Sequence, residues 1–399
     1  MCYQKKYGTY DLVGEKSIIW KKIINEIEKL CELYNFKYIK TPIFESTDLF
    51  FDMIGENTDI ISKELYNFYD KNNEHIALRP EGTTGVIRSY IENKIYLKEK
   101  TSKFYYYGSM FRQEEVENGR FREFQQFGVE VFDNNDYIND VEVISLAVNI
   151  FKHLGLNDIT VYINNLGSIN DKEKYENDIR IYLEPFLNLL CDDCKKRFND
   201  NPIRILDCKK DKRRDFIVNA PKIKKYVNKE SKNRFDSILN HLNKLQISYV
   251  INENLVRGIN YYTDTVFEIK TSIEGYGSRN TICGGGRYNN SVKTDLNEKI
   301  PAIGFAIGLE RLIHILELKN ILNIDENMID FNINFEDFEL LLFLRNMNFI
   351  SDFKSCNLSK YTIDKLDEKY IFYDNINHKK RLLSKENLIK HILKIKKNS

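Results

Sequence analysis

The stretch that decides the fold is FYYYGSMFRQEEVENGRFREFQQFGVEVF, Phe104–Phe132. Its two halves have the pattern of β-strands, and the segment EVENG between them has the composition of a turn. The downstream half alternates with period two, so that one face would carry Arg120, Arg122, Phe124, Gln126, Gly128 and Glu130. We therefore predict a β-hairpin with one functionalised face, suited to a charged ligand.

A second informative stretch is PAIGFAIGLERLIHIL, Pro301–Leu316. Small residues at every second position, from Ala302 to Gly308, would leave one face of a strand almost without side chains. A flat ligand could lie on that face. Arg311 falls in the first turn of the helix that follows, where the helix dipole and a guanidinium can together bind phosphate oxygens. Close packing of a helix on the strand would explain the small residues equally well.

Length and composition indicate a folded globular protein. The 399 residues are 42% hydrophobic and 30% charged, which is enough for a large core and two or three domains. No apolar run approaches the roughly 20 residues of a membrane-spanning helix, and the N-terminal residues lack the apolar stretch of a signal peptide. We expect a cytoplasmic protein without a membrane partner.

The near-neutral net charge of +1 conceals two basic segments. Residues 191–232 contain fourteen Lys and Arg against seven Asp and Glu, and residues 378–399 contain eight against one. Such segments favour a polyanionic partner, although solvated helix faces give the same pattern.

The seven cysteines do not suggest a disulfide framework, because their number is odd and they are scattered. Cys191, Cys194 and the nearby Cys208 would supply three of the four ligands of a zinc site. The nearest downstream histidine is His241, so structural or incidental thiols are favoured over zinc, which stays the alternative.

The order of expected elements suggests a core interrupted by an insertion. Helices are expected at residues 15–36, 83–99 and 139–154, and strands in YIKTPIFES, reaching Pro42, and at DITVYINNL. Residues 167–246 are charged and helix-like, after which strands resume with ISYVIN, YYTDTVFEIK and GFAIG. Composition shifts from about residue 326, where a separate C-terminal unit is expected.

These stretches resemble a known family. Phe111, Arg112, Glu114 and RFREF resemble motif 2 of class II aminoacyl-tRNA synthetases, GFAIGLERL resembles motif 3, and IKTPIFE resembles the weaker motif 1. Within that class, LRPEGT, LVRGINYYTDTVFE and CGGGRY are similar to signatures of histidyl-tRNA synthetases. The motifs occur in the expected order from residue 8 to about residue 320.

The resemblance implies an α+β fold in which an antiparallel β-sheet flanked by helices forms the class II catalytic core. Residues 1–166 and 247–325 would form the two parts of this core. Residues 167–246 would be a helical insertion domain. Residues 326–399 would form a small α/β domain like an anticodon-binding domain, shorter than is usual.

The resemblance also implies roles for individual residues. ATP would be bound by Arg112, Glu114, Arg120, Phe124 and Arg311, with Arg112 on the α-phosphate and Arg311 on the γ-phosphate. Phe124 would stack on adenine, and Glu114 would accept a hydrogen bond from the exocyclic amine. Mg²⁺ would be held mainly by the nucleotide phosphates, without a dedicated protein site.

The amino acid, L-histidine, would be bound by Glu81, Gly82, Thr83, Gln126, Glu130, Arg257, Tyr261 and Tyr262. Glu81, Thr83 and Gln126 would accept from its ammonium group, whereas Glu130 and Tyr262 would bind its imidazole. Residues Gly284 to Gly286 would let the backbone form the pocket wall. Arg257 and Arg112 would be catalytic, because both would stabilise charge on the α-phosphoryl oxygens during adenylate formation.

The implied activity is activation of L-histidine with ATP and its transfer to tRNA(His) by a homodimer. A non-catalytic regulatory subunit of ATP phosphoribosyltransferase shares the fold, and a plain tRNA-binding module is a third alternative. Taken singly, the motifs have simpler explanations: RPEGT could be a helix N-terminus, and Tyr261 and Tyr262 ordinary strand aromatics. Asp264 departs from the family pattern and could alter the charge near the substrate.

Overall fold

The computed structural model describes residues 3–117, 119–133, 135–208, 210–257, 259, 261–272, 280–289, 292–294, 298–322, 329–354 and 358–398. The chain divides into two compact units, one of residues 1–12 and 20–321 and the other of residues 13–19 and 322–399.

The predicted hairpin is present at the centre of the first unit. Strand β5 (Ser102–Phe111) pairs with strand β6 (Glu123–Phe132) in antiparallel register. Phe127, Val129 and Val131 are fully buried on one face of β6, as the alternation of the sequence predicts. The other face carries Phe124 and Gln126, both of which line a cavity.

The hairpin belongs to an eight-stranded sheet with the order β1-β5-β6-β11-β10-β9-β7-β8. The other strands are β1 (Lys37–Tyr38), β7 (Ile159–Asn165), β8 (Tyr249–Ile251), β9 (Thr263–Thr271), β10 (Thr281–Arg287) and β11 (Ala302–Gly308). The six central strands are antiparallel as expected, but β1 pairs with β5 and β8 with β7 in parallel. The sheet is therefore mixed. The two strands of each parallel pair are joined by a long crossover that contains helices, as parallel pairing requires.

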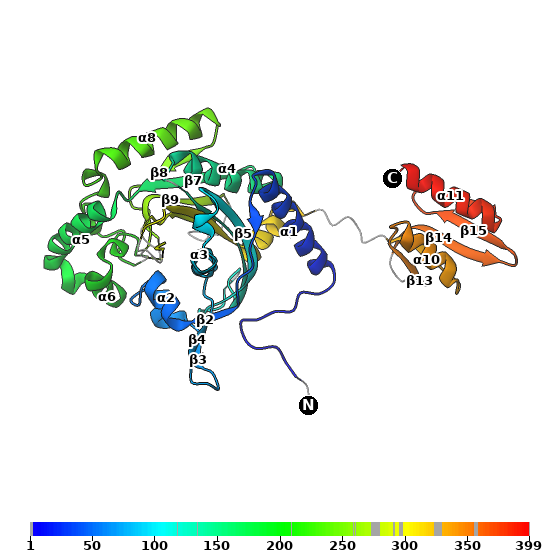
Figure 1. Cartoon of the computed structure of the whole chain (residues 1–399), viewed down its shortest axis with the longest axis horizontal. Coiled ribbons are helices and arrows are strands. Elements are labelled where there is room, and N and C mark those ends of the chain that lie inside the picture. The colour runs from blue at the N-terminus through cyan, green and yellow to red at the C-terminus, as the bar shows by residue number, and fades with distance from the viewer. Residues whose placement is uncertain are drawn as a thin grey trace. The chain divides into compact units, whose positions relative to one another are not determined.

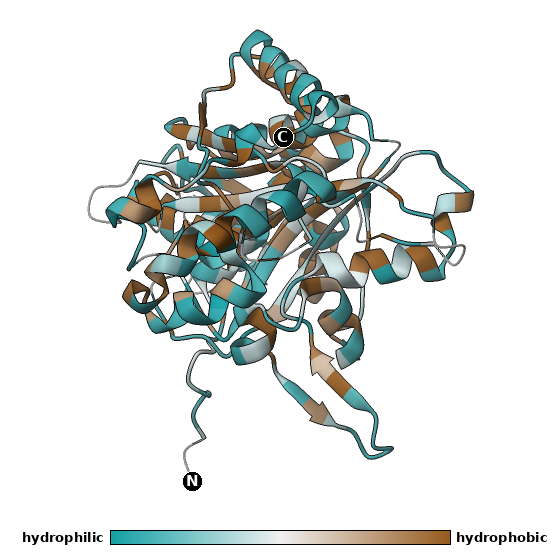
Figure 2. Ribbon diagram, turned by 90° about the vertical axis from the view of Figure 1, so that its left-hand side faces the viewer, coloured by the Kyte–Doolittle hydropathy of each residue, from teal (hydrophilic) through white to brown (hydrophobic). Residues whose placement is uncertain are grey.

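Helices cover both faces of this sheet (Figure 1). They are α1 (Glu15–Leu33), α2 (Thr47–Ile54), α3 (Thr83–Glu92), η2 (Ile95–Leu97), α4 (Tyr137–His153) and α9 (Leu309–Leu318), together with the π-helix η1 (Ile60–Glu64). Helices α4 and α9 contact β6 and β11, whereas α3 lies inside the curve of the sheet, where Tyr90 stacks on Phe132. In Figure 2 hydrophobic colour follows the interior strands, and hydrophilic colour dominates the outer helices.

The strand expected at YIKTPIFES is in fact two strands in two sheets. Strand β1 ends before Pro42, and β2 (Phe44–Ser46) pairs with β4 (His75–Leu78), which also pairs with β3 (Asn67–Tyr69). Proline has no N–H to continue a ladder, which explains the break. The carbonyl oxygens of Thr41 and Pro42 instead accept hydrogen bonds from Arg79.

The insertion between β7 and β8 is helical, as predicted. It comprises α5 (Ile169–Leu183), η3 (Glu184–Leu189), α6 (Asp192–Asp200), η4 (Pro202–Ile205), α7 (Asp215–Val218), η5 (Ile223–Lys225) and α8 (Lys229–Lys244). Most of these helices are short, and a small apolar core of its own, including Tyr175, Ile179 and Ile205, holds them together.

The second unit is an α/β domain, which confirms the expected class. Its five-stranded sheet has the order β13-β12-β14-β15-β16. The strands are β12 (Ile329–Ile333), β13 (Ser351–Phe353), β14 (Ser359–Leu366), β15 (Lys369–Asp374) and β16 (Lys379–Leu383), with helices α10 (Phe338–Asn346) and α11 (Lys385–Asn398). In the described part of the chain, no helix has the length and apolarity needed to cross a membrane.

Candidate active site

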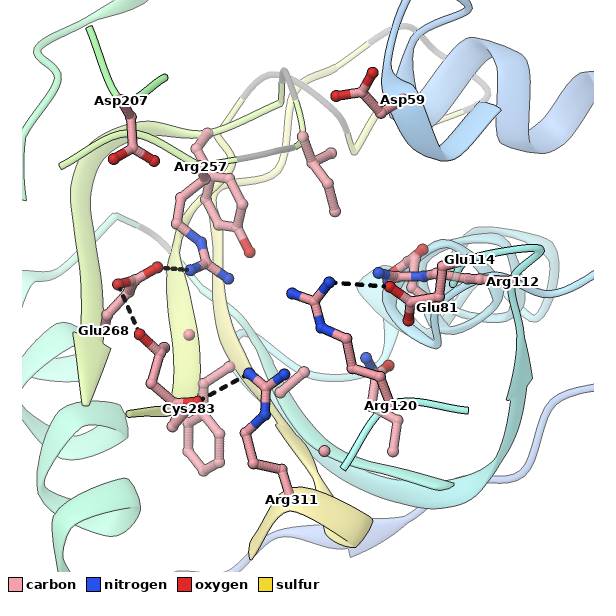
Figure 3. A pocket seen from close by; sticks show the side chains of 18 of the residues that line it. Asp59, Glu81, Arg112, Glu114, Arg120, Asp207, Arg257, Glu268, Cys283 and Arg311 are labelled. Carbon is pink, nitrogen blue, oxygen red and sulfur yellow. Dashed lines mark hydrogen bonds and ion pairs between the residues drawn. The ribbon is translucent and has the colours of Figure 1, made fainter. Parts of the chain in front are cut away.

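A cavity of about 750 Å³ lies in the first unit. Most of the predicted site residues line it, although they come from distant parts of the sequence: Glu81, Thr83, Arg112, Glu114, Arg120, Phe124, Gln126, Arg257, Tyr261, Tyr262 and Arg311. Gly82 and Glu130 do not line the cavity. Figure 3 shows the guanidinium groups of Arg120, Arg257 and Arg311 directed into the same space.

One wall of the cavity is almost free of side chains, as the sequence predicts. Gly304, Ala306 and Gly308 of β11 and Gly284 of the neighbouring β10 line it. A Cβ atom on Gly304 would lie 1.9 Å from Glu130 Oε2, and one on Gly284 would lie 2.1 Å from Arg257 Nη2. The glycines therefore make room for two polar side chains as well as for a flat ligand.

Arg112, Arg257 and Arg311 are each held by a different part of the chain. The Nε atom of Arg112 donates to the carbonyl oxygen of Pro80 over 2.9 Å. Arg257 forms an ion pair of 2.7 Å with Glu268 on β9, and Nη1 of Arg311 donates to the carbonyl oxygen of Thr281 over 3.2 Å. These contacts fix the guanidinium groups around one volume, which is an arrangement suited to phosphate oxygens.

The turn after β5 carries a second group of candidate residues. Arg120 pairs with Glu114 over 3.3 Å, and the guanidinium of Arg112 lies 5.3 Å from the centre of the Phe124 ring. Gly119 has a φ of +74°, and a Cβ on it would lie 3.1 Å from the Cα of Arg311. The turn therefore packs closely on the start of α9.

The residues predicted to bind an ammonium group surround the start of α3. The carboxylate of Glu81 accepts from the backbone N–H groups of Thr83 and Thr84, each over 2.8 Å. Glu81 therefore caps the helix, so the simpler explanation of RPEGT is also correct. Gln126 Oε1 accepts from the N–H of Gly82 over 3.0 Å, which places Gly82 behind the wall as a positioning group.

Glu130 lies beneath the cavity and is only 1% exposed. Thr83 donates to one of its oxygens over 2.6 Å, and the Tyr288 hydroxyl donates to the other. Burial raises the pKa of Glu130 to about 8. Thr83 and Tyr288 both line the cavity. A ligand that replaced the hydrogen bond of either residue to Glu130 would therefore contact this carboxyl group.

Tyr261 and Tyr262 pack against each other with ring centroids 4.7 Å apart. Both are 8% exposed and line the cavity. The guanidinium of Arg257 lies 5.9 Å from the centre of the Tyr262 ring. Burial raises the pKa of both hydroxyl groups, so both remain hydrogen-bond donors at neutral pH.

Asp264 does not reach the cavity. Its backbone has a φ of +47°, and its buried carboxylate accepts from the Ser231 hydroxyl over 2.7 Å and from Asn289 over 3.0 Å. The residue ties helix α8 of the insertion to the core. We expected Asp264 to alter the charge near a substrate. In the structure it makes a contact between the insertion and the core instead.

Several lining residues were not identified from the sequence. Glu268 and Tyr288 belong to the quoted motifs, but the motifs alone assigned them no role. In the structure Glu268 pairs with Arg257, and Tyr288 donates to Glu130. Arg204, Asp207 and Lys210 belong to the insertion. No local pattern could have shown that the insertion reaches the cavity.

Comparison with known proteins agrees with these features. A family model described as histidyl-tRNA synthetase matches residues 8–170 and 209–312. A histidine–tRNA ligase of Oceanobacillus iheyensis is 43% identical over 332 residues, covering 83% of this chain and 77% of that protein. One from Halothermothrix orenii is 46% identical over 314 residues, covering 79% and 74%.

Solved structures show the same likeness. The crystal structure of apo Staphylococcus aureus histidyl-tRNA synthetase superposes with a TM-score of 0.81 at 32% identity, covering 98% of this chain and all of that one. A Bacillus halodurans protein described as an ATP phosphoribosyltransferase regulatory subunit/histidyl-tRNA synthetase gives 0.63 at 19% identity, covering 90% and 93%. The latter match bears on the fold alone.

Proposed function

The chain belongs to the histidyl-tRNA synthetase family and is a histidine–tRNA ligase, and from this premise we propose how its cavity carries out the reaction. The ligase function implies ATP, L-histidine and tRNA(His) as substrates. In the first step the carboxylate of histidine attacks the α-phosphorus of ATP and releases pyrophosphate. In the second step the histidyl group passes from the adenylate to the 3′ ribose hydroxyl of the tRNA.

The nucleotide lies against the bare wall formed by β10 and β11. Arg112 binds the α-phosphate and Arg311 the γ-phosphate, while Phe124 stacks on adenine. Glu114 accepts from the exocyclic amine, which requires that its 3.3 Å pair with Arg120 rearranges when ATP binds. Arg120 is then released toward the phosphates. Two guanidinium groups held by separate elements suit a bent triphosphate better than lysines would.

Histidine lies between the start of α3 and the two tyrosines. Glu81 and Thr83 accept from its ammonium group, and Gln126, whose carbonyl oxygen already accepts from Gly82, positions that wall. Tyr262 and Glu130 bind the imidazole, with Tyr261 and Tyr288 beside them. An apolar amino acid would offer Glu130 no hydrogen bond. A buried carboxyl group left without a partner costs free energy, so such an amino acid would be rejected.

Arg257 is the group that acts most directly on the first step. Its pair with Glu268 and its position over Gly284 support a guanidinium held still before the substrates arrive. Together with Arg112 it stabilises the negative charge that develops on the α-phosphoryl oxygens. A donor that is already oriented loses little free energy to reorganisation during the step.

We expect Mg²⁺ to be held mainly by the nucleotide. Two of the carboxylates that line the cavity are already engaged: Glu268 with Arg257 and Lys270, and Glu310 with the Tyr10 hydroxyl. These pairs fit an ion bound through phosphate oxygens better than one bound by a protein cage. When bound, the ion would neutralise charge on the β- and γ-phosphates.

The tRNA would contact the two basic segments. Lys210 and Lys212 of the insertion line the cavity, which supports contact with phosphates near the 3′ end. In the second unit, β16 and α11 carry the other basic segment, and we propose that it contacts tRNA phosphates as a shortened anticodon-binding-like domain. Since its product feeds protein synthesis, we also propose a cytoplasmic location.

We propose a homodimer formed through the β2-β4-β3 sheet. This sheet projects from the rest of its unit (Figure 1), and one of its faces exposes 58% of Phe44 and 47% of Phe68. An exposed apolar face of this kind, next to the stretch IKTPIFE that resembles motif 1, is typical of an interface between subunits.

The observation that carries the proposal is the convergence of Arg112, Arg257 and Arg311 on one cavity whose other end has polar groups suited to histidine. The test is exchange of labelled pyrophosphate into ATP by the purified chain with each amino acid in turn. We expect exchange that depends on histidine. Absence of exchange with histidine, in protein that is folded, would instead agree with a regulatory subunit.

A further inference from the structure

Three thiols and a carboxylate converge in the insertion, outside the substrate-binding groups. Cys191, Cys194, Cys208 and Asp211 each direct one possible ligand atom to a common point, and these four atoms all lie within 4.8 Å of one another. Cys194, Cys208 and Asp211 are buried, and Cys191 is partly buried. The sequence offered no fourth cysteine or histidine nearby, and the structure supplies Asp211 in that place.

Two of the distances in this cluster are close to those of a tetrahedral metal site. Four ligands around zinc, with Zn–S bonds of about 2.3 Å, place their sulfur atoms about 3.8 Å apart and a sulfur about 3.6 Å from a carboxylate oxygen. The Cys191 and Cys208 sulfur atoms are 3.7 Å apart. Cys208 Sγ lies 3.9 Å from Asp211 Oδ2.

The ligand atoms are held by two turns of the same length. Cys191 and Cys194 are three residues apart, and so are Cys208 and Asp211. In both turns the backbone N–H of the later residue donates to the sulfur of the earlier one. Such a pair of turns presents four donors from two short segments, as structural zinc sites do.

The groups around the carboxylate hold it in one orientation. Asp211 Oδ2 accepts from the backbone N–H of Cys191 over 2.9 Å, and Oδ1 pairs with Arg214 Nε over 2.9 Å. Outer partners of this kind orient a ligating carboxylate. The side chain of Asp211 is fully buried in the part of the insertion where the thiols and apolar residues pack. A core that only packed cysteines would not need a buried carboxylate there.

We propose that Cys191, Cys194, Cys208 and Asp211 bind one structural zinc ion. Three thiolates and one carboxylate fill all four positions, so the site is closed and takes no part in the chemistry of aminoacylation. The insertion is built from short helices around a small core, and small units of this kind commonly depend on a metal or a disulfide. A closed site leaves no cysteine of the cluster over, whereas a disulfide would leave one thiol unused.

The ion would connect the insertion to the active site. Asp207, Cys208, Lys210 and Lys212 surround the second turn and line the cavity. Helix α6 begins within the first turn, with Cys191 as its N-cap, and carries Arg197, which pairs with Asp59 of the core over 2.8 Å. Figure 3 shows Asp59 and Asp207 across the cavity from Arg311. Zinc would therefore fix the insertion's side of the cavity.

The test is the metal content of the full chain, purified without chelators and dialysed. We expect about one zinc per chain, and a loss of most of it in Cys194→Ser and in Asp211→Asn. The matched control is Cys31→Ala, which removes a buried thiol of α1 outside the cluster and should retain one zinc. Removal of zinc by a chelator should lower the melting temperature, and added zinc should restore it.

A second variant keeps the test decisive if loss of a ligand unfolds the insertion. Asp211→Cys would convert the set to four thiolates, and this variant should bind zinc at least as tightly as the natural chain. With cobalt it should show stronger thiolate-to-metal absorption. Wild-type protein with no zinc and no cobalt spectrum, zinc that persists in Cys194→Ser, or a disulfide between Cys191 and Cys208 in the purified protein would each overturn the proposal.

Discussion

At Gly284, the lack of a side chain determines where the Arg257 guanidinium can lie. A Cβ atom there would fall within 2.1–2.4 Å of the Arg257 guanidinium. The end of an arginine is flexible, so the added methyl would displace it without much cost to the fold. The displacement would break the 2.7 Å pair between Arg257 and Glu268.

Gly284→Ala should therefore lower kcat for pyrophosphate exchange by about tenfold or more, with little change in melting temperature. The control is a double-mutant cycle with Arg257→Ala. Because the glycine is proposed to act through the arginine, adding Gly284→Ala to Arg257→Ala should cost almost nothing further. Fully additive losses would show that Gly284 acts independently of Arg257, through its contact with the nucleotide.

Glu130 makes the stability of the ligand-free protein depend on pH. Burial raises its pKa from an ordinary value of 4.5 to about 8, so between these values the folded protein holds a proton that the unfolded chain has released. The contribution of this residue to stability therefore falls as pH rises from about 5 to about 8, by at most ~1.4 kcal/mol per pH unit.

The prediction is checked by denaturant unfolding of wild type and Glu130→Gln across this range. The variant cannot ionise at this position, so its stability relative to wild type should increase with pH. Saturating histidine should reduce the dependence if it binds at Glu130. A constant difference between the two proteins would mean that Glu130 is ionised in the folded state already at pH 5.

At the scale of elements, the insertion and the C-terminal sheet carry the charge that a tRNA requires. Lys212 and Arg213 are exposed beside the cavity-lining turn, and Lys379 and Lys380 are exposed on β16. Arg214 is left aside because it pairs with Asp211. The two pairs can thus be tested separately.

Changing either pair to glutamine should weaken aminoacylation of tRNA and reduce the salt slope of tRNA binding by about one for each phosphate that the variant no longer binds. Pyrophosphate exchange should be unchanged, because it needs no tRNA. The matched control changes Lys21 and Lys98, exposed lysines outside both basic segments. Equal losses in exchange and aminoacylation would argue against a role in tRNA binding.

The elements also show what the sequence could predict. The β5-β6 hairpin, the bare face of β11 and helix α9 follow from local alternation and composition, which act within a few residues. We expected the strand in YIKTPIFES to reach Pro42, and the separate strand β2 that follows this proline was not predicted. Asp264, Asp211 and Glu268 could not be placed, because their partners are brought near only by the tertiary fold.

At the scale of the whole molecule, the proposed dimer interface is the β2-β4-β3 sheet. Phe44 lies opposite Leu78 in the sheet, and Phe68 lies opposite Ile76. Burial of this apolar face against a second copy would stabilise the dimer in proportion to the area covered. The chain should sediment as a dimer at micromolar concentration.

Phe44→Asp should shift the sedimentation coefficient toward that of a monomer, because a charge would be buried in the interface. The control Ile181→Asp changes an exposed apolar residue of the insertion and should leave the dimer intact. A monomeric wild type, or a Phe44→Asp variant that remains dimeric, would rule out this interface.

The central claim is that guanidinium groups from separate segments act together on the α-phosphate of ATP. Arg257→Ala tests it most directly, with histidine binding and histidine-dependent pyrophosphate exchange measured on the same preparation. The account predicts that histidine affinity changes little while exchange slows by at least ~10²-fold, the usual loss for one such donor. Exchange at the wild-type rate in this variant would contradict it.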